Sequence, residues 1–241
     1  MTGEASSDLT RVYVWQVPVR VTHWLIALSI IVLSVTGFYI GRPFMTVPGQ
    51  AGRWFVMGWM RAIHFYAAIV FTCAVIARII SMFTGNKYAR WDKFLSVHRT
   101  RQKGILPTVL FYSFLRDKPP AYVGHNPVAG SAYLLVFGLY LLAIGTGLVM
   151  HAPSAEAGSP LRWFASFAPL FGGFQIARWI HHVVMWLLLG FMLHHVYSAV
   201  LVAAIEKNGT IDSIVAGYKW VPRHDLEPGP YRWLHNGDLD E

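Results

Sequence analysis

Four apolar segments, each long enough to cross a lipid bilayer, dominate this sequence. A spanning helix needs about 20 apolar residues, and the segments are roughly Thr22–Ile40, Ala62–Phe83, Pro127–Met150 and Trp179–Ile205. Arg78 is the one formally charged residue within them. A charged content of 13% over 241 residues excludes an ordinary soluble domain. We therefore predict an all-α fold, an integral membrane four-helix up-down-up-down bundle that forms a single domain over residues 1–241.

The basic residues of the loops predict the orientation of these spans. Loop 84–126 carries eight of them, whereas loop 41–61 carries three and loop 151–178 carries two. The positive-inside rule places loop 84–126 in the cytoplasm, and four spans then put both termini, including the tail 206–241, on the same side. The net charge of +8 thus reflects membrane topology rather than a nucleic-acid surface. Ile105–Leu115 is apolar but too short to cross, so we expect a short interfacial helix there.

Histidines lie inside three of the four spans. His181 and His195 are fourteen residues apart in the uncharged fourth span, which places them on one helical face and ~21 Å apart along the axis. His64 begins the second span and His23 begins the first. An imidazole within a membrane segment is costly and usually serves a function. The predicted directions of the spans put His64 level with His181 on the outer side, and His23 towards the level of His195 on the inner side.

This arrangement predicts two sites that each take two imidazole ligands, as a pair of b-type haems would. The iron ligands are then His64 with His181 and His23 with His195. Cys73 is the only cysteine, and no C-x-x-C-H motif exists, so the haems must be non-covalent. Two axial histidines leave the iron no open position, which favours electron transfer over substrate binding.

Doubled histidines in the fourth span leave a choice of ligands. At 100° per residue, positions 181 and 195 face within about 40° of each other, whereas 182 and 194 differ by about 120° and the mixed pairs by about 140°. Only the outer pair shares a face. We therefore expect His182 and His194 to support the ligands or to form hydrogen bonds between helices.

Two further residues follow the same spacing. Gly37 lies fourteen residues after His23, and Arg78 lies fourteen after His64. A flat porphyrin needs small residues where a helix meets it, so Gly37 is a candidate for cofactor contact, and Gly145, Gly147 and Gly190 could serve likewise. Each glycine could equally be a plain helix-packing position. Arg78 is a candidate partner for a haem propionate, or alternatively an anchor that snorkels towards the interface.

The remaining histidines carry weaker expectations. His125 and His151, at the two ends of the third span, are most simply interhelical hydrogen-bonding residues. His98, His125 and the apolar run Ile105–Leu115 are candidates for lining a quinone site near the inner haem. The segment Gly124–Pro127 is expected to be a turn, since proline begins a helix well.

Several stretches of the chain resemble one known family. VYVWQVPVRVTHWLIALSIIVLSVTGFYIGRP (12–43) and GNKYARW (85–91) are similar to the b-type cytochrome subunits of membrane-bound nickel–iron uptake hydrogenases. The likeness extends over nearly the whole chain, through MGWMRAIHF (57–65), GHNP (124–127), HHVY (194–197) and GYK (217–219). The histidine pattern alone is shared with a wider di-haem superfamily, which includes formate dehydrogenase membrane subunits.

The resemblance implies a concrete function. It implies two b haems at His23, His64, His181 and His195, in a bacterial inner-membrane subunit that anchors a periplasmic hydrogenase heterodimer. Electrons would pass from the iron–sulfur small subunit of that nickel–iron enzyme to membrane quinone, and outer loops 41–61 and 151–178 would form the docking surface. Alternatives are a di-haem subunit of a formate or thiosulfate enzyme, a stand-alone quinone-linked haem oxidoreductase, and a non-redox anchor or transporter without haem.

Overall fold

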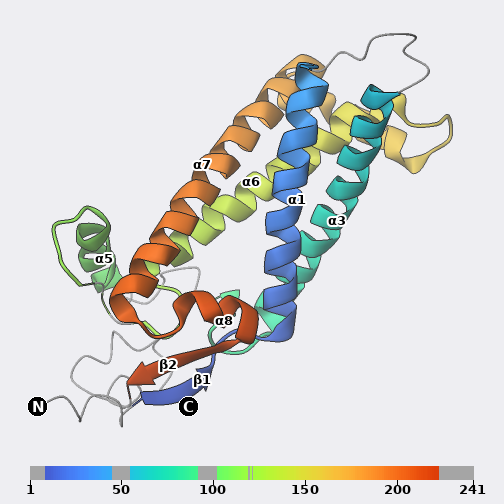
Figure 1. Ribbon diagram of the computed structural model, residues 1–241. Coiled ribbons are helices and arrows are strands. Elements are labelled where there is room, and N and C mark those ends of the chain that lie inside the picture. Colours follow the sequence, from blue (N-terminus) through green and yellow to red (C-terminus); the bar gives the residue numbers. More distant parts are fainter. Residues whose placement is uncertain (1–8, 45–54, 92–101, 119, 121, 223–241) are drawn as a thin grey trace, which may run out of the picture. The chain divides into compact units, whose positions relative to one another are not determined.

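Four long helices form the framework of the molecule (Figure 1). The computed structural model describes residues 9–44, 55–91, 102–118, 120 and 122–222. The helices are α1 (Val17–Gly41), α3 (Val56–Thr84), α6 (Pro127–His151) and α7 (Phe174–Glu206). All four are long and apolar enough to cross a membrane. The four predicted spans are therefore confirmed, and each helix runs at least slightly beyond its predicted apolar segment.

Shorter elements join these helices. A short helix, α5 (Ile105–Tyr112), forms where the interfacial helix was expected and ends three residues before the predicted run does. The 3₁₀ segments η2 (Ala152–Ser154) and η3 (Pro160–Phe171) lie between α6 and α7, and the short helix α8 (Thr210–Ala216) follows α7. Two five-residue strands, β1 (Leu9–Tyr13) and β2 (Tyr218–Pro222), complete the described chain. The predicted all-α membrane bundle is confirmed, and this two-stranded sheet is a small addition to it.

The chain divides into two compact units, and each contains part of every long helix. One unit comprises residues 1–20, 78–137 and 191–241, and we call it the strand unit because it holds β1 and β2. The other comprises residues 21–77 and 138–190. We call this second part the histidine unit, because it holds His64 and His181.

Local sequence explains where the helices begin and end. Asn126 caps α6, because its side-chain Oδ1 accepts a hydrogen bond from the backbone N–H of Ala129 at 2.7 Å and Pro127 occupies the first helical position. The chain bends at residues 123–124, just before the third span, where a turn was expected. Gly172 and Gly173, with φ of 78° and 95°, form the sharp turn that separates η3 from α7.

Within the histidine unit, aromatic contacts show that neighbouring helices run antiparallel. Phe65 of α3 stacks on His151 of α6 with ring centroids 4.6 Å apart, and six residues further along α3, Phe71 meets Tyr140 at 5.2 Å. As the position on α3 advances, the contact on α6 moves back towards the helix start. Phe38 of α1 likewise packs edge-on against Trp186 of α7 at 5.2 Å. These contacts agree with an up-down-up-down bundle.

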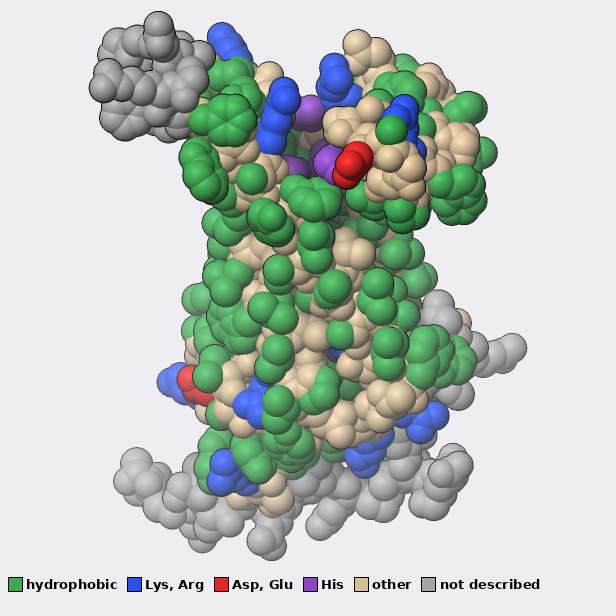
Figure 2. Space-filling view, turned by 90° about the vertical axis from the view of Figure 1, so that its right-hand side faces the viewer, with side chains coloured by type: hydrophobic (Ala, Val, Ile, Leu, Met, Phe, Trp, Pro, Cys, Tyr) green, Lys and Arg blue, Asp and Glu red, His purple; other side chains and the backbone are tan. Residues whose placement is uncertain are grey.

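The outward faces of the long helices are apolar. Figure 2 shows hydrophobic side chains along the helices, with Lys and Arg side chains closer to the helix ends. Leu135 and Leu193, for example, are 67% and 75% exposed. A water-soluble protein does not leave such a surface uncovered, whereas lipid chains solvate it well.

In the strand unit, β1 and β2 form a two-stranded antiparallel sheet in which Leu9 pairs with Pro222 and Tyr13 with Tyr218. The strands lie beside α8 (Figure 1). Gly217, with φ of 92°, directly precedes β2. A Cβ added at this residue would lie 2.6 Å from the Tyr13 ring and 2.9 Å from the Trp15 carbonyl oxygen. Only glycine fits this position.

Candidate functional site

Two histidines of the histidine unit have matching surroundings. On α3, the imidazole Nδ1 of His64 lies 2.8 Å from the hydroxyl of Thr36 on α1. On α7, the imidazole Nδ1 of His181 lies 2.9 Å from the hydroxyl of Thr146 on α6. The structure thus gives equivalent surroundings, within one compact unit, to the two histidines that the sequence assigned to the outer site.

The two threonine hydroxyls fix the direction of these hydrogen bonds. Thr36 Oγ1 lies 2.7 Å from the carbonyl oxygen of Val32 on its own helix, and Thr146 Oγ1 lies 2.7 Å from that of Leu142. A carbonyl oxygen can only accept, so at this distance the single hydroxyl proton is donated to it. The hydroxyl oxygen must then accept from the histidine, whose Nδ1 carries the proton.

This hydrogen-bond direction determines which histidine nitrogen can act as a ligand. With Nδ1 protonated in a neutral imidazole, Nε2 keeps its lone pair. A metal-bound histidine is held in the same way, since a partner to one ring nitrogen orients the other towards the metal. His64 and His181 are therefore both prepared to coordinate through Nε2.

A glycine follows each of these threonines and lies against the same ring. A Cβ added at Gly37 would lie 3.4 Å from Cε1 and 3.9 Å from Nδ1 of His64. A Cβ added at Gly147 would lie at the same two distances from Cε1 and Nδ1 of His181. The small residues therefore let the histidine-bearing helices approach closely. Gly37, which the sequence predicted at the depth of the outer site, lies against the imidazole of His64.

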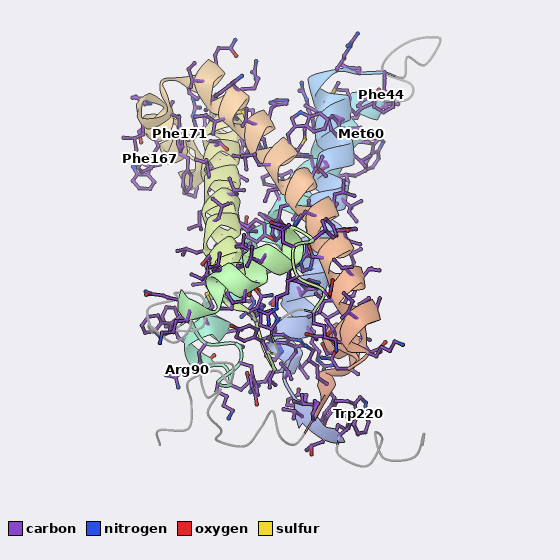
Figure 3. The ribbon with its side chains drawn as sticks, turned by 90° about the vertical axis from the view of Figure 1, so that its left-hand side faces the viewer. Phe44, Met60, Arg90, Phe167, Phe171 and Trp220 are labelled. Carbon is purple, nitrogen blue, oxygen red and sulfur yellow. The ribbon has the colours of Figure 1, made fainter. Side chains whose placement is uncertain are left out.

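The other glycines named from the sequence have different neighbours. An added Cβ at Gly145 would lie 3.6 Å from the Phe171 ring, whereas nothing lies within 4 Å of one at Gly190. Figure 3 shows Phe171 and Phe167 on η3, where they pack against the buried cluster of Val149, Ala168 and Ala177. Gly145 is therefore a packing position between α6 and η3.

The other histidines of the described spans differ from His64 and His181 in exposure or in the groups that their rings contact. His182 is exposed, and its Nδ1 lies 2.7 Å from the carbonyl oxygen of Arg178 one turn earlier on α7. His194 is also exposed, with the Ser198 hydroxyl 3.4 Å from its Nδ1. His195 stacks on Phe191 with ring centroids 5.7 Å apart, and His23 packs edge-on against Trp24 at 5.4 Å.

Neither helix-end histidine of the third span is isolated. His151 stacks on Phe65, the neighbour of His64. His125 lies between the rings of Trp15, at 4.8 Å, and Tyr133, at 5.2 Å. His98, the other histidine considered for an inner site, lies outside the described residues.

Arg78 is the most deeply buried charged side chain among the described residues of the strand unit. It is 1% exposed, its Nε donates a hydrogen bond to the Tyr133 hydroxyl at 3.0 Å, and its guanidinium carbon lies 5.3 Å from the centre of that ring. A snorkelling arginine would place its charged group at the surface instead. The burial of Arg78 argues against that alternative.

Comparison with known proteins identifies the family of this chain. Residues 14–217 match the prokaryotic cytochrome b561 family. The chain is 36% identical over 218 residues to the probable Ni/Fe-hydrogenase B-type cytochrome subunit of Cupriavidus necator, with 89% of each chain covered. The corresponding proteins of Azotobacter vinelandii and Escherichia coli K12 are 37% and 35% identical, over 90% of this chain and 93% and 94% of theirs.

The chain belongs to the prokaryotic cytochrome b561 family. It is accordingly a multi-pass membrane cytochrome that carries b-type haem and transfers electrons within the bilayer. The residues of the histidine unit fit this cofactor. His64 and His181 each leave Nε2 available, and glycine at positions 37 and 147 leaves room beside each ring.

Sequence reasoning missed the two threonines of this cytochrome. Thr36 and Thr146 are ordinary residues of apolar helices when viewed alone, and their helices lie far from the histidines in sequence. One signal could have found them: Thr-Gly occurs in both the first and the third span, in each case in the last part of the helix. His64 and His181 each lie in the first part of the helix that comes next in the chain. Because neighbouring helices run antiparallel, the end of one helix lies beside the start of the next, and each threonine meets its histidine there.

Proposed function

We propose that this cytochrome is the di-haem membrane subunit of a nickel–iron hydrogenase and passes electrons to membrane quinone. The observation that carries the proposal is the matched pair of histidines, His64 and His181, each with its Nδ1 proton held by a threonine. A haem iron with two imidazole ligands carries one electron and has no open position for a substrate. The site therefore suits electron transfer rather than catalysis at the iron.

His64 and His181 would hold the outer haem through Nε2, with Gly37 beside it. The threonine bonds and the room next to each ring support this assignment. His182 is a poorer candidate than His181, because His182 is exposed whereas His181 is half-buried. The choice made from helical angles agrees with these contacts.

His23 and His195 would hold the inner haem. This pair rests on the spacing along the sequence and on the family resemblance. Arg78, which lies fourteen residues after His64 on α3, would bind a propionate as a buried cation. A guanidinium recognises a carboxylate through two parallel hydrogen bonds, which makes arginine well suited to this role.

The loop charges support an inner-membrane orientation with both termini in the cytoplasm. His64 and His181 would then lie near the periplasmic side. The outer loops 41–61 and 151–178 would dock the iron–sulfur small subunit, which is bound to the nickel–iron large subunit. The names of the relatives, which call them Ni/Fe-hydrogenase subunits, support this choice of partner over a formate or thiosulfate enzyme.

Haem quantitation tests the proposal directly. Purified protein and alanine variants of the four histidines are compared by reduced-minus-oxidised spectra and by haem-to-protein ratio. We expect two haems in the native protein, and the loss of the same one on His64→Ala and His181→Ala. His182→Ala serves as the matched control and should keep both. A variant pattern in which His182→Ala loses haem and His181→Ala does not would reject the assignment.

Purification from the native membrane tests the partner. A tag on this chain should bring down a nickel-containing heterodimer, and hydrogen should then reduce the haems of the complex. A molybdenum- or tungsten-containing partner in its place would favour the formate-type alternative. Quinone reduction by the isolated chain with no partner enzyme would favour a stand-alone oxidoreductase.

A further inference from the structure

The contacts of His64 and His181 follow one repeated pattern on two separate pairs of helices. In each pair a Thr-Gly step on one helix faces a histidine on the next, Thr36-Gly37 on α1 and Thr146-Gly147 on α6. The glycine Cβ positions lie at identical distances, 3.4 Å and 3.9 Å, from the same two ring atoms of their histidines. Chance packing has no reason to repeat both the hydrogen bond and the clearance.

We propose that Thr36 and Thr146 are positioning residues that set the ring orientation and the electron-donating strength of the two outer haem ligands. This inference rests on the proposed role of His64 and His181 as ligands. The threonines touch neither substrate nor iron. They act through the histidines, by accepting the Nδ1 proton in a hydrogen bond.

The chemistry of the acceptor gives the expected direction of the effect. A hydrogen bond from Nδ1–H makes the imidazole a stronger donor to the metal. A stronger donor stabilises the oxidised iron more than the reduced iron, and this lowers the reduction potential. A threonine hydroxyl is a neutral acceptor that already donates its proton to the helix carbonyl, so it strengthens the ligand without adding a charge inside the membrane.

The test compares Thr36→Val and Thr146→Val with Thr36→Ser and Thr146→Ser. Valine keeps the shape of threonine but cannot accept a hydrogen bond, whereas serine keeps the hydroxyl. Thr72→Val is the matched control: Thr72 on α3 makes the same 2.7 Å bond to the carbonyl four residues earlier, that of Ala68, and its hydroxyl bonds to no imidazole of the described residues. Haem content, midpoint potential and the low-spin ferric EPR signal are measured for each purified complex.

We expect each valine variant to change one haem only. That haem shifts to a more positive midpoint potential with an altered EPR signal, or is lost, and the serine variant restores the native values while Thr72→Val leaves both haems unchanged. Unchanged potentials and EPR signals in both valine variants would overturn the inference, and so would equal losses in the valine and serine variants. If a valine variant does not accumulate, the alanine variant of the same threonine is measured instead.

The histidine variants separate this inference from the proposed function. If His64→Ala and His181→Ala each lose the outer haem while the threonine variants behave as the native protein does, only the role of the threonines is wrong. If the histidine variants retain both haems, the ligand assignment itself is wrong, and the inference fails with it.

Discussion

At the scale of single residues, Gly147 of the histidine unit lies directly against the ring of His181. A Cβ at Gly147 would already be in van der Waals contact with the ring, at 3.4 Å from Cε1. Alanine should therefore be tolerated, but the branched methyl groups of Gly147→Val should displace the imidazole. Overpacking of this kind typically costs about 1–3 kcal/mol. We expect loss of the outer haem and a lower unfolding temperature in detergent.

A second glycine of the same helix provides the control for this prediction. Nothing lies within 4 Å of a Cβ added at Gly138, so Gly138→Val should leave haem content and unfolding temperature close to the native values. If Gly138→Val and Gly147→Val behave alike, the cause is the change in helix propensity and not contact with His181.

Lys219 allows a prediction about pH in the strand unit. It is 5% exposed, and burial lowers the pKa of its ammonium group below the ordinary value of 10.5, although attraction to Glu206 opposes the shift. Between the lowered pKa and 10.5, the unfolded chain binds this proton and the folded chain does not. The free energy of unfolding should therefore rise with pH through that window.

The measurement is the unfolding temperature in detergent from pH 7 to about 10.5, compared between the native chain and Lys219→Met. The native chain should gain stability relative to this variant as the pH rises, because the cost of burying the charge disappears. Lys207→Met removes an exposed lysine nearby in the sequence and should show no such trend. A native-minus-variant difference that stays constant over the whole range would contradict the prediction.

At the scale of elements, the pairing of β1 with β2 depends on Gly217. An alanine there would be strained at φ of 92° and would overlap Tyr13 and the Trp15 carbonyl. Gly209→Ala is the matched control, since its φ of 78° imposes similar strain but its Cβ would meet nothing nearer than 3.8 Å. Gly217→Ala should cost about 1–3 kcal/mol and Gly209→Ala less. Limited proteolysis of residues 9–13 and 218–222 should detect the difference, and equal protection would contradict it.

The elements differ in how far the sequence could predict them. The long helices were predictable because an apolar segment that crosses a bilayer must satisfy its own backbone hydrogen bonds, and this is a local property. The strands β1 and β2 were not predicted, because each has only five residues and its partner lies some 200 positions away in the sequence. The 3₁₀ segment η3 was also missed, since its internal Pro169 argues against a continuous helix.

The candidate site likewise has one part that the sequence could predict and another that it could not. Histidine spacing and helix direction placed His64 with His181, because both depend on helical geometry that the sequence determines. The bonds to Thr36 and Thr146 depend on the exact rotation of α1 against α3 and of α6 against α7. That rotation is set by side-chain packing between helices, which one sequence does not reveal.

At the scale of the whole molecule, the distribution of basic residues predicts how the protein sits in the membrane. Loop 84–126 carries eight lysines and arginines, against three in loop 41–61 and two in loop 151–178. Because positively charged loops stay in the cytoplasm, a fluorescent-protein fusion after residue 241 should be bright and an alkaline phosphatase fusion there inactive. A phosphatase inserted in loop 151–178 should be active. Reversed activities would put His64 and His181 on the cytoplasmic side, where a periplasmic electron donor cannot reach them.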